Sequence, residues 1–103
     1  MSFDAEKYHK EVKEKYADTI KALDVLKKHK DELSKNYDEV IGIFIHEFAE
    51  VIALPFEDEV ADITKQADEF GVNYCTMKIH QLISPYLPDY QEMAEKLESY
   101  YSW

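Results

Sequence analysis

The chain contains one cysteine, no arginine and few of the residues that interrupt helices. With Cys75 as its single cysteine it cannot form an internal disulfide, which fits a reducing compartment. Only 2 Gly and 3 Pro occur among 103 residues, so long helices joined by few turns are expected. No segment approaches the roughly 18–20 uninterrupted apolar residues of a membrane span. Residues 1–12 are charged and do not resemble a signal peptide. We therefore expect a cytoplasmic protein with no membrane partner.

Charge is distributed unevenly along the chain. All 12 basic residues are lysines, and the net charge is −10. Residues 1–35 hold 9 Lys against 8 Asp and Glu, whereas residues 36–103 hold 3 Lys against 14 acids, which gives −11. Arginine, the residue that binds phosphate through two parallel hydrogen bonds, is missing. The acidic charge and the lack of arginine together argue against a nucleic-acid partner.

One long apolar stretch, residues 37–54, stands out from the charged remainder. At about 100° per residue its large apolar side chains fall in one broad arc, which is typical of a helix that contacts neighbours on two sides. These residues are Tyr37, Val40, Ile41, Phe44, Ile45, Phe48, Val51 and Ile52. Asn36 and Glu39 have the spacing of a capping box at the start. Pro55 predicts the end of the helix at Leu54.

Apolar spacing predicts further helices on both sides of this central one. The expected ranges are 4–30, 57–70, 73–84 and 89–101, with a break at Ser34–Asn36 and a stiff linker at 84–88. The caps expected at the helix starts are Asp4 or Ser2, Asn73, and Asp89 with Glu92, and Gly71 is expected to end the helix before it. The residues expected to face inward include Val60, Ile63, Ala67 and Phe70, then Tyr74, Met77 and Ile83, then Met93, Leu97 and Tyr100 or Tyr101. A short strand around Val72, Tyr74 and Thr76 is the alternative to the fourth helix.

The chain should therefore fold as a single all-α domain, residues 1–103. We predict a compact antiparallel bundle of four to five helices around the central helix 37–54. Gly42, Ala49 and Ala53 share one face of that helix, where small side chains would let another backbone approach closely. A homodimer that packs through this face is therefore one expectation.

Residues 63–83 resemble the helix-turn-helix of DNA-binding regulators. Ala67 is followed four residues later by Gly71, then by an apolar residue and by another at Met77. The segment departs from the pattern at His80 and Gln81, where a packed apolar residue is expected. Phosphate contacts supply most of the affinity in such proteins, so a strongly acidic chain favours an ordinary helical corner over a DNA-reading motif.

A metal site is a second alternative. His46 and Glu50 lie one helical turn apart and Glu39 two turns before His46, a set that can hold zinc or iron, and His80 or His9 would have to complete it. Helical metalloproteins repeat such pairs on facing helices, and no second pair occurs here. We expect no metal and no cofactor, with His46 partly buried against a carboxylate.

No catalytic motif is present: the chain has no glycine-rich phosphate loop, no glycine-flanked serine and no cysteine with an obvious histidine partner. By elimination, the sequence favours a non-catalytic acidic protein-binding module, such as a regulator, adaptor or inhibitor. Its partner would be a protein with a basic or apolar surface. A DNA mimic of the phage or mobile-element type, which inhibits a nucleic-acid-binding protein, is the alternative that the acidic charge suggests.

The binding residues are expected in two acidic helices and the aromatic C-terminus, since tyrosine and tryptophan are favoured at interfaces. They are Glu57, Asp58, Glu59, Asp62, Tyr90, Tyr100, Tyr101 and Trp103.

Overall fold

The computed structural model describes residues 3–102, and within this range every regular element is helical. The elements are α1 (Ala5–Lys28), α2 (Lys30–Leu33), η1 (Ser34–Asn36), α3 (Tyr37–Ala53), η2 (Leu54–Phe56), α4 (Glu57–Lys65), α5 (Ala67–Phe70), α6 (Val72–Ile83) and α7 (Tyr90–Glu98). The prediction of an all-α helical bundle is confirmed.

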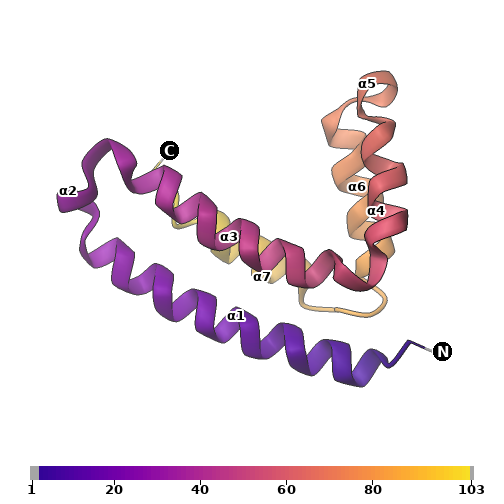
Figure 1. Cartoon of the computed structure of the whole chain (residues 1–103), viewed down its shortest axis with the longest axis horizontal. Helices are drawn as coiled ribbons and strands as arrows, with labels where there is room; N and C mark the ends of the chain where they lie inside the picture. The colour runs from indigo at the N-terminus through magenta and orange to yellow at the C-terminus, as the bar shows by residue number, and fades with distance from the viewer. Residues whose placement is uncertain (1–2, 103) are drawn as a thin grey trace.

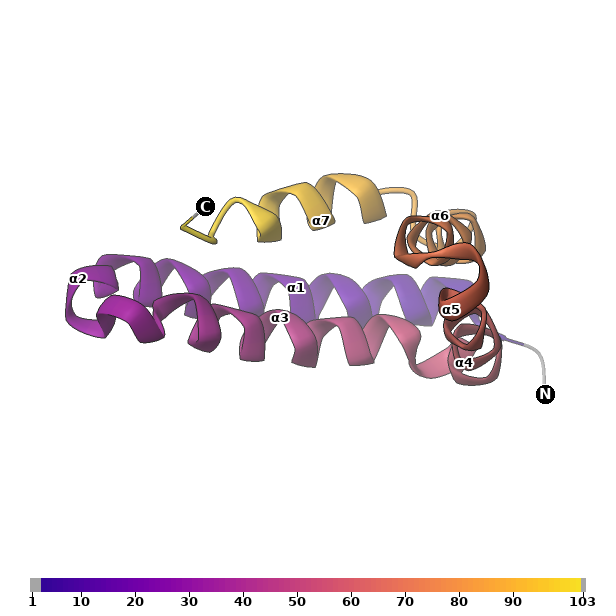
Figure 2. The ribbon, with the colours of Figure 1, turned by 90° about the horizontal axis from the view of Figure 1, so that it is seen from above.

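Three helices form an elongated body. α1 and α3 run antiparallel and are joined by the short turn of α2 and η1 (Figure 1). α7 lies along this pair, parallel to α1 and antiparallel to α3 (Figure 2). The apolar stripe of α1 and the broad arc of α3 meet there, because each helix must remove its apolar face from water.

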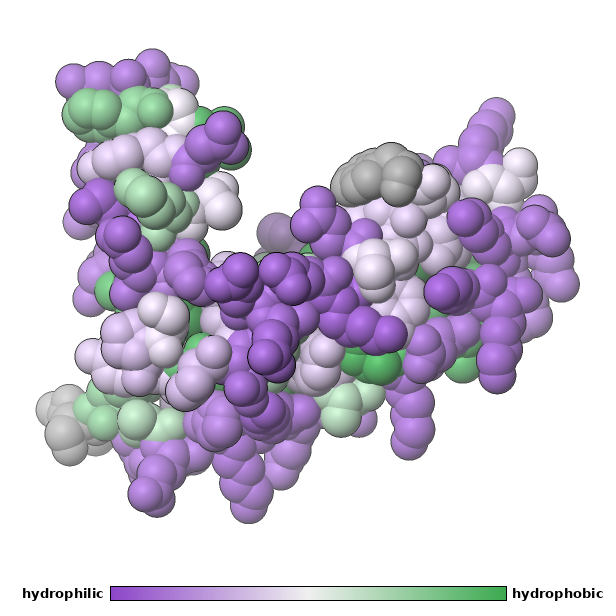
Figure 3. Space-filling view, turned by 180° about the vertical axis from the view of Figure 1, so that it is seen from behind, coloured by the Kyte–Doolittle hydropathy of each residue, from purple (hydrophilic) through white to green (hydrophobic). Residues whose placement is uncertain are grey.

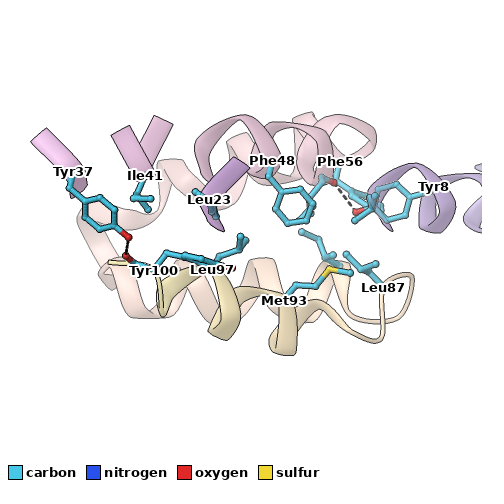
Figure 4. Close-up of a cluster of buried hydrophobic side chains, with 13 residues drawn as sticks. Tyr8, Leu23, Tyr37, Ile41, Phe48, Phe56, Leu87, Met93, Leu97 and Tyr100 are labelled. Carbon is cyan, nitrogen blue, oxygen red and sulfur yellow. Dashed lines mark hydrogen bonds between the residues drawn. The ribbon is translucent and has the colours of Figure 1, made fainter. Parts of the chain in front are cut away.

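The core consists of side chains from all three helices of the body, from the segments that join them to the arm and from the end of α6. Its buried members are Tyr8, Val12, Leu23, Tyr37, Ile41, Phe48, Ile52, Phe56, Ile83, Leu87, Met93, Leu97 and Tyr100 (Figure 4). The predicted central helix supplies four of these, at positions 37, 41, 48 and 52, as its apolar arc requires.

The remaining helices form an arm that projects from one end of the body. α4 and α6 lie side by side, with α5 at the tip, roughly perpendicular to α3 (Figures 1 and 2). The molecule is therefore L-shaped, with extents of 45 × 35 × 19 Å. Its radius of gyration of 14.9 Å exceeds the roughly 13 Å of an equally long spherical domain, since the arm carries mass away from the body.

An aromatic cluster secures the corner between arm and body. The rings of Phe3, Tyr8, Phe56 and Tyr86 stack in tilted and edge-on pairs, with centroids 5.2 to 5.7 Å apart. Such pairs each add about 0.5–1.5 kcal/mol beyond area burial. The cluster joins the start of α1, the turn after α3 and the linker before α7.

Several predicted helix boundaries are correct. The Asp4 carboxylate accepts a hydrogen bond from the Lys7 amide and caps α1, at 3.0 Å. The α-helical run is interrupted at residues 34–36, where Ser34 has a φ of 52°. α3 ends at Ala53, just before Pro55. Gly71 has a φ of 91° and stops α5.

The other expected caps are wrong. Neither Asn36 nor Asp89 makes a side-chain capping bond, and Gly71 rather than Asn73 precedes α6. The Asp89 carboxylate instead forms an ion pair with Lys13 on α1. A short 3₁₀ turn leads directly into α3, so the backbone itself takes the place of the cap at Asn36.

The arm differs most from the expectations. The helix predicted over 57–70 is interrupted at Gln66, and the alternative strand near Val72 is absent, because Val72 begins α6. Phe70 and Met77, both predicted to face inward, are 52% and 48% exposed. The arm consists of α4, α6 and the short helix α5, which cannot cover both faces of either longer helix, whereas the prediction assumed a surrounding bundle.

Candidate functional site

A groove runs between α3 and α7 on the body. It has a volume of about 180 Å³, and its floor consists of the core side chains Phe48, Ile52, Met93 and Leu97. Ile45 and Ala49 of α3 and Ala94 of α7 line its walls, and Tyr90 and Tyr101 lie at its margins. Alanines on both helices leave the space above the floor unfilled, since a methyl group cannot reach across the gap between two helices.

The groove continues into the inner corner of the L. A hollow of about 240 Å³ lies where Ala53 of α3 meets Val60 of α4 and Ile79 of α6. Another, of about 450 Å³, lies between α6 and α7 and is lined by Met77, His80 and Ala94 among others. Tyr90 borders all three spaces. These three neighbouring spaces share lining residues, and we refer to them together as the inner-corner groove.

Tyr90 is held in place at the centre of the groove. Its ring lies against His80 of α6 in a tilted arrangement, with centroids 5.3 Å apart, and burial raises the pKa of its hydroxyl. The ring therefore lies between arm and body and borders all three spaces. An ordered aromatic ring of this kind supplies contact area with little loss of side-chain entropy on binding.

The charge around the inner-corner groove is negative. Glu95 and Glu98 of α7 line it, whereas none of its lining residues is a lysine. Glu95 accepts a hydrogen bond from Gln91 at 3.3 Å, and neither glutamate has a cationic partner within residues 3–102. Lys96 of the same helix points to the opposite side, 5.3 Å from the Tyr100 ring centroid. Figure 3, which views the α7 side, shows hydrophilic surface interrupted by smaller apolar patches below the arm.

The predicted site residues do not form one surface. Glu57, Asp58, Glu59 and Asp62 are exposed on α4, but that helix turns Val60 toward the groove, so none of the four is among the lining residues. Asp62 lies 3.9 Å from Lys65 in an exposed ion pair.

Of the predicted aromatic residues, Tyr90 and Tyr101 line the groove, Tyr100 does not, and Trp103 lies outside the described residues. Tyr100 belongs to the core, with 3% of its surface exposed, so a partner cannot reach it. Its hydroxyl donates to the Asp24 carboxylate at 2.5 Å, and its carbonyl accepts from Tyr37 at 2.7 Å (Figure 4). Burial, together with the bond to Asp24, holds the pKa of Tyr100 well above its usual range.

The face expected to form a homodimer is partly occupied by the chain itself. A Cβ atom added to Gly42 would lie 3.4 Å from the Tyr101 hydroxyl. Ala49 and Ala53, farther along α3, line the inner-corner groove. The close approach that these small residues permit is therefore used, at Gly42, by the C-terminal segment of the same chain.

Within residues 3–102, no three His, Cys, Asp or Glu side chains gather as a metal-binding group. His46 does pair with Glu50, at 3.0 Å, but its side chain is 74% exposed, so the expectation of partial burial is wrong. Cys75 is buried, and its thiol lies 3.2 Å from the Ile63 carbonyl. That contact ties α6 to α4.

The segment that resembles a helix-turn-helix has a different geometry. α4 and α6 lie alongside each other as a helical hairpin (Figures 1 and 2), whereas the helices of that motif cross at about 90–120°. Lys78, which would be its main cation, lies 5.6 Å from the Tyr74 ring centroid.

Sequence reasoning missed Ile45, Ala94, Glu95 and Glu98 as candidate site residues, and it placed Ala49 only in a homodimer face. Ala94 falls one helical turn after Tyr90 and one before Glu98, a spacing visible in the sequence. What the sequence does not show is that this edge of α7 lies beside Ala49 of α3.

No helix in the described part of the chain combines the length and apolarity needed to cross a membrane. No protein-family model, no curated protein and no solved structure matches the chain.

Proposed function

We propose that the protein is a non-catalytic acidic module that binds another protein through its inner-corner groove, as a regulator, adaptor or inhibitor would. The observation that carries the proposal is an open groove with apolar walls, a partly buried tyrosine that borders all three of its spaces, and carboxylates at the margin. Groups of this kind match the anatomy of protein interfaces, in which an apolar centre is surrounded by a polar rim.

The groove chemistry supports binding more than catalysis. Its titratable lining groups are His80, Tyr90, Tyr101, Glu95 and Glu98. His80 contacts Tyr90 ring to ring in a tilted arrangement, whereas a catalytic base must reach a nucleophile through a hydrogen bond. The predicted acidic residues of α4 are exposed and would act by attracting a basic partner during encounter, since rim charges mainly change association rates.

Filling the groove tests this function. An Ala94→Trp substitution places an indole between α3 and α7, and Ala17→Trp on the exposed surface of α1 is the matched control. Tagged proteins would be used to capture partners from native lysate, with nuclease added, and the bound proteins quantified by mass spectrometry. Circular dichroism checks that both variants keep their helix content.

We expect the wild type and Ala17→Trp to retain the same partner and Ala94→Trp to lose it. Capture that is unchanged by Ala94→Trp, or no specific capture by the wild type, would contradict the proposal. A triple variant with Glu57, Asp58 and Asp62 changed to lysine should slow the capture of that partner, and an unchanged rate would remove α4 from the binding surface.

A further inference from the structure

We infer that the occupant of the inner-corner groove is an amphipathic α-helix of another protein, with lysine or arginine beside its apolar face. This inference rests on the proposed function and names the chemistry of the partner. Three observations support it: the shape of the groove, the unpaired carboxylates on its margin and the strongly negative charge of the chain itself.

The shape favours a helix. On α3 the groove is lined by Ile45, Ala49 and Ala53, four residues apart, and on α7 by Tyr90, Ala94 and Glu98 with the same spacing. Each stripe covers nine residues, or about 12 Å of helix at 1.5 Å per residue. A ligand helix of two to three turns would match this length, with apolar anchors at i, i+3 or i+4, and i+7.

The backbone excludes the main alternative shape. An extended peptide binds by adding a strand to a sheet edge, where free amides and carbonyls are available. Both walls of the groove are helices, whose interior backbone groups are already hydrogen-bonded. Recognition must therefore come from side chains, as in the packing of one helix into the groove between two others.

The charge favours a basic helix. Glu95 and Glu98 line the groove without cationic partners, and residues 36–103, which include both walls, carry −11. A lysine or arginine at the edge of the ligand's apolar face would lie next to these carboxylates. An acidic helix would meet like charge, which costs affinity and slows encounter.

A second copy of this chain fits the groove poorly. Two copies would each bring a net charge of −10. The one lysine-rich helix of the chain is α1, and its apolar stripe of Tyr8, Val12 and Leu23 is buried in its own core. It therefore has no apolar face left to offer to another groove.

Designed peptides test the inference directly. The probe is a fluorescein-labelled peptide of about 14 residues, with leucine at helical i, i+3, i+4 and i+7 spacing and lysine elsewhere. Three comparison peptides have the same residues in scrambled order, glutamate in place of lysine, or glutamine in place of lysine. Binding to the intact protein is measured by fluorescence anisotropy at low and physiological salt.

We expect the affinity of the leucine–lysine peptide to be at least about tenfold higher than that of each comparison peptide. Ala94→Trp should weaken its binding about tenfold, and the pair Glu95→Gln and Glu98→Gln should weaken it severalfold. Two controls, Ala17→Trp and the pair Glu14→Gln and Asp18→Asn on α1, make matched changes of size and charge away from the groove. They should leave the affinity unchanged.

Equal binding of the scrambled peptide, or equal weakening by the α1 pair, would show non-specific charge attraction and overturn the inference. Equal binding of the leucine–glutamine helix would overturn the basic occupant while leaving groove binding in place. The basic helical occupant would also be overturned, with groove binding left in place, if no peptide binds while Ala94→Trp still loses the partner captured from lysate. A concentration-dependent dimer that Ala94→Trp abolishes would show that the occupant is a second copy.

Discussion

Two buried tyrosines form polar links in the core. The Tyr37 hydroxyl donates to the Tyr100 carbonyl at 2.7 Å, and the Tyr8 hydroxyl donates to the Ile52 carbonyl at 2.8 Å (Figure 4). The Tyr37 bond joins the start of α3 to the segment after α7, and the Tyr8 bond joins the start of α1 to the last turn of α3. Carbonyls in the last turn of a helix have no intrahelical donor. The tyrosines thus give these two backbone carbonyls a buried hydrogen-bond donor.

A Tyr37→Phe substitution keeps the ring but removes the donor to the Tyr100 carbonyl. We expect the free energy of unfolding to fall by about 1–3 kcal/mol, the cost of an unsatisfied buried polar group. Urea denaturation measures this difference. Tyr86→Phe is the control, because its side chain is 40% exposed and keeps its ring contacts; an equal loss in both variants would contradict the role of the Tyr37 bond.

Alkaline pH should separate the buried tyrosines from the exposed ones. Burial raises the pKa of Tyr8 to about 12, and burial also raises the pKa of Tyr37 and Tyr100 above the ordinary 10.0. These hydroxyls stay protonated in the folded state at pH values where the unfolded chain ionises. Their contribution to stability is therefore complete below about pH 10 and is lost as pH rises through the folded pKa values.

A titration of tyrosinate absorbance, followed together with circular dichroism, should show two groups among the 8 tyrosines. The first group should ionise near its usual pKa with the helices intact. The second should ionise only as the helices unfold. A single ionisation step with unchanged helix content would contradict the assignment of the buried group.

At the scale of the elements, the two glycines have different roles. Gly71, between α5 and α6, has φ 91° and ψ 163°, a region almost restricted to glycine, and a Cβ there would contact nothing within 4 Å. Gly42 lies inside α3, where glycine is less favourable than alanine. The backbone conformation therefore requires glycine at position 71 but not at position 42.

Gly71→Ala should therefore lower the free energy of unfolding by about 1–3 kcal/mol through backbone strain. Gly42→Ala should change it little or raise it by up to about 1 kcal/mol, because the gain in helix propensity offsets a 3.4 Å contact with the Tyr101 hydroxyl. Thermal or urea unfolding compares the two. A larger loss at Gly42 would mean that the contact with Tyr101 cannot adjust.

Ser102, in the segment after α7, is hydrogen-bonded to the first turn of α3. The Asp38 carboxylate accepts hydrogen bonds from the Ser102 amide at 2.9 Å and from its hydroxyl at 2.6 Å. These bonds lower the pKa of Asp38, so their contribution is present above the ordinary value of 3.8 and disappears as pH falls through the folded value.

We expect Asp38→Ala to speed hydrogen exchange in residues 99–102 without unfolding the body, because the fastening is local and exposed. Glu39→Ala, a neighbouring exposed acid that makes no bond to this segment, serves as the control. Unchanged exchange in Asp38→Ala, or equal acceleration in Glu39→Ala, would show that other contacts hold the chain end.

At the scale of the whole molecule, the dominant feature is the excess of acidic over basic residues, 22 against 12. The chain has a net charge of −10, so its carboxylates repel one another in the folded, L-shaped molecule. Exposed ion pairs such as Lys13–Asp89 offset little of this repulsion. Screening by salt should therefore stabilise the folded state, since the Debye length shortens as ionic strength rises.

The urea midpoint should rise as sodium chloride increases from a few millimolar to about 0.5 M. A parallel series in potassium chloride checks that ionic strength and not the cation is responsible. A midpoint that falls with salt would show that attractive pairs outweigh the overall repulsion.

The sequence by itself determined that the chain is helical, where several of its helices begin or end, and most of the core of the body. Period-3.6 apolar spacing, Pro55 and Gly71 act on neighbouring residues, so they specify the ends of α3 and α5 wherever those helices lie in space. The same spacing identified Tyr37, Phe48 and Leu97 as core residues, because a helix with an apolar arc must bury that arc.

Only the tertiary structure decided which faces meet. The sequence left open whether Tyr100 or Tyr101 faces inward; the structure buries Tyr100, whose hydroxyl donates to Asp24, far away in sequence. Asp89 pairs with Lys13 instead of capping α7. The groove exists because Ala49 and Ala94 come from two helices placed side by side. Such long-range pairings depend on how all the helices share one core, which no local pattern of residues encodes.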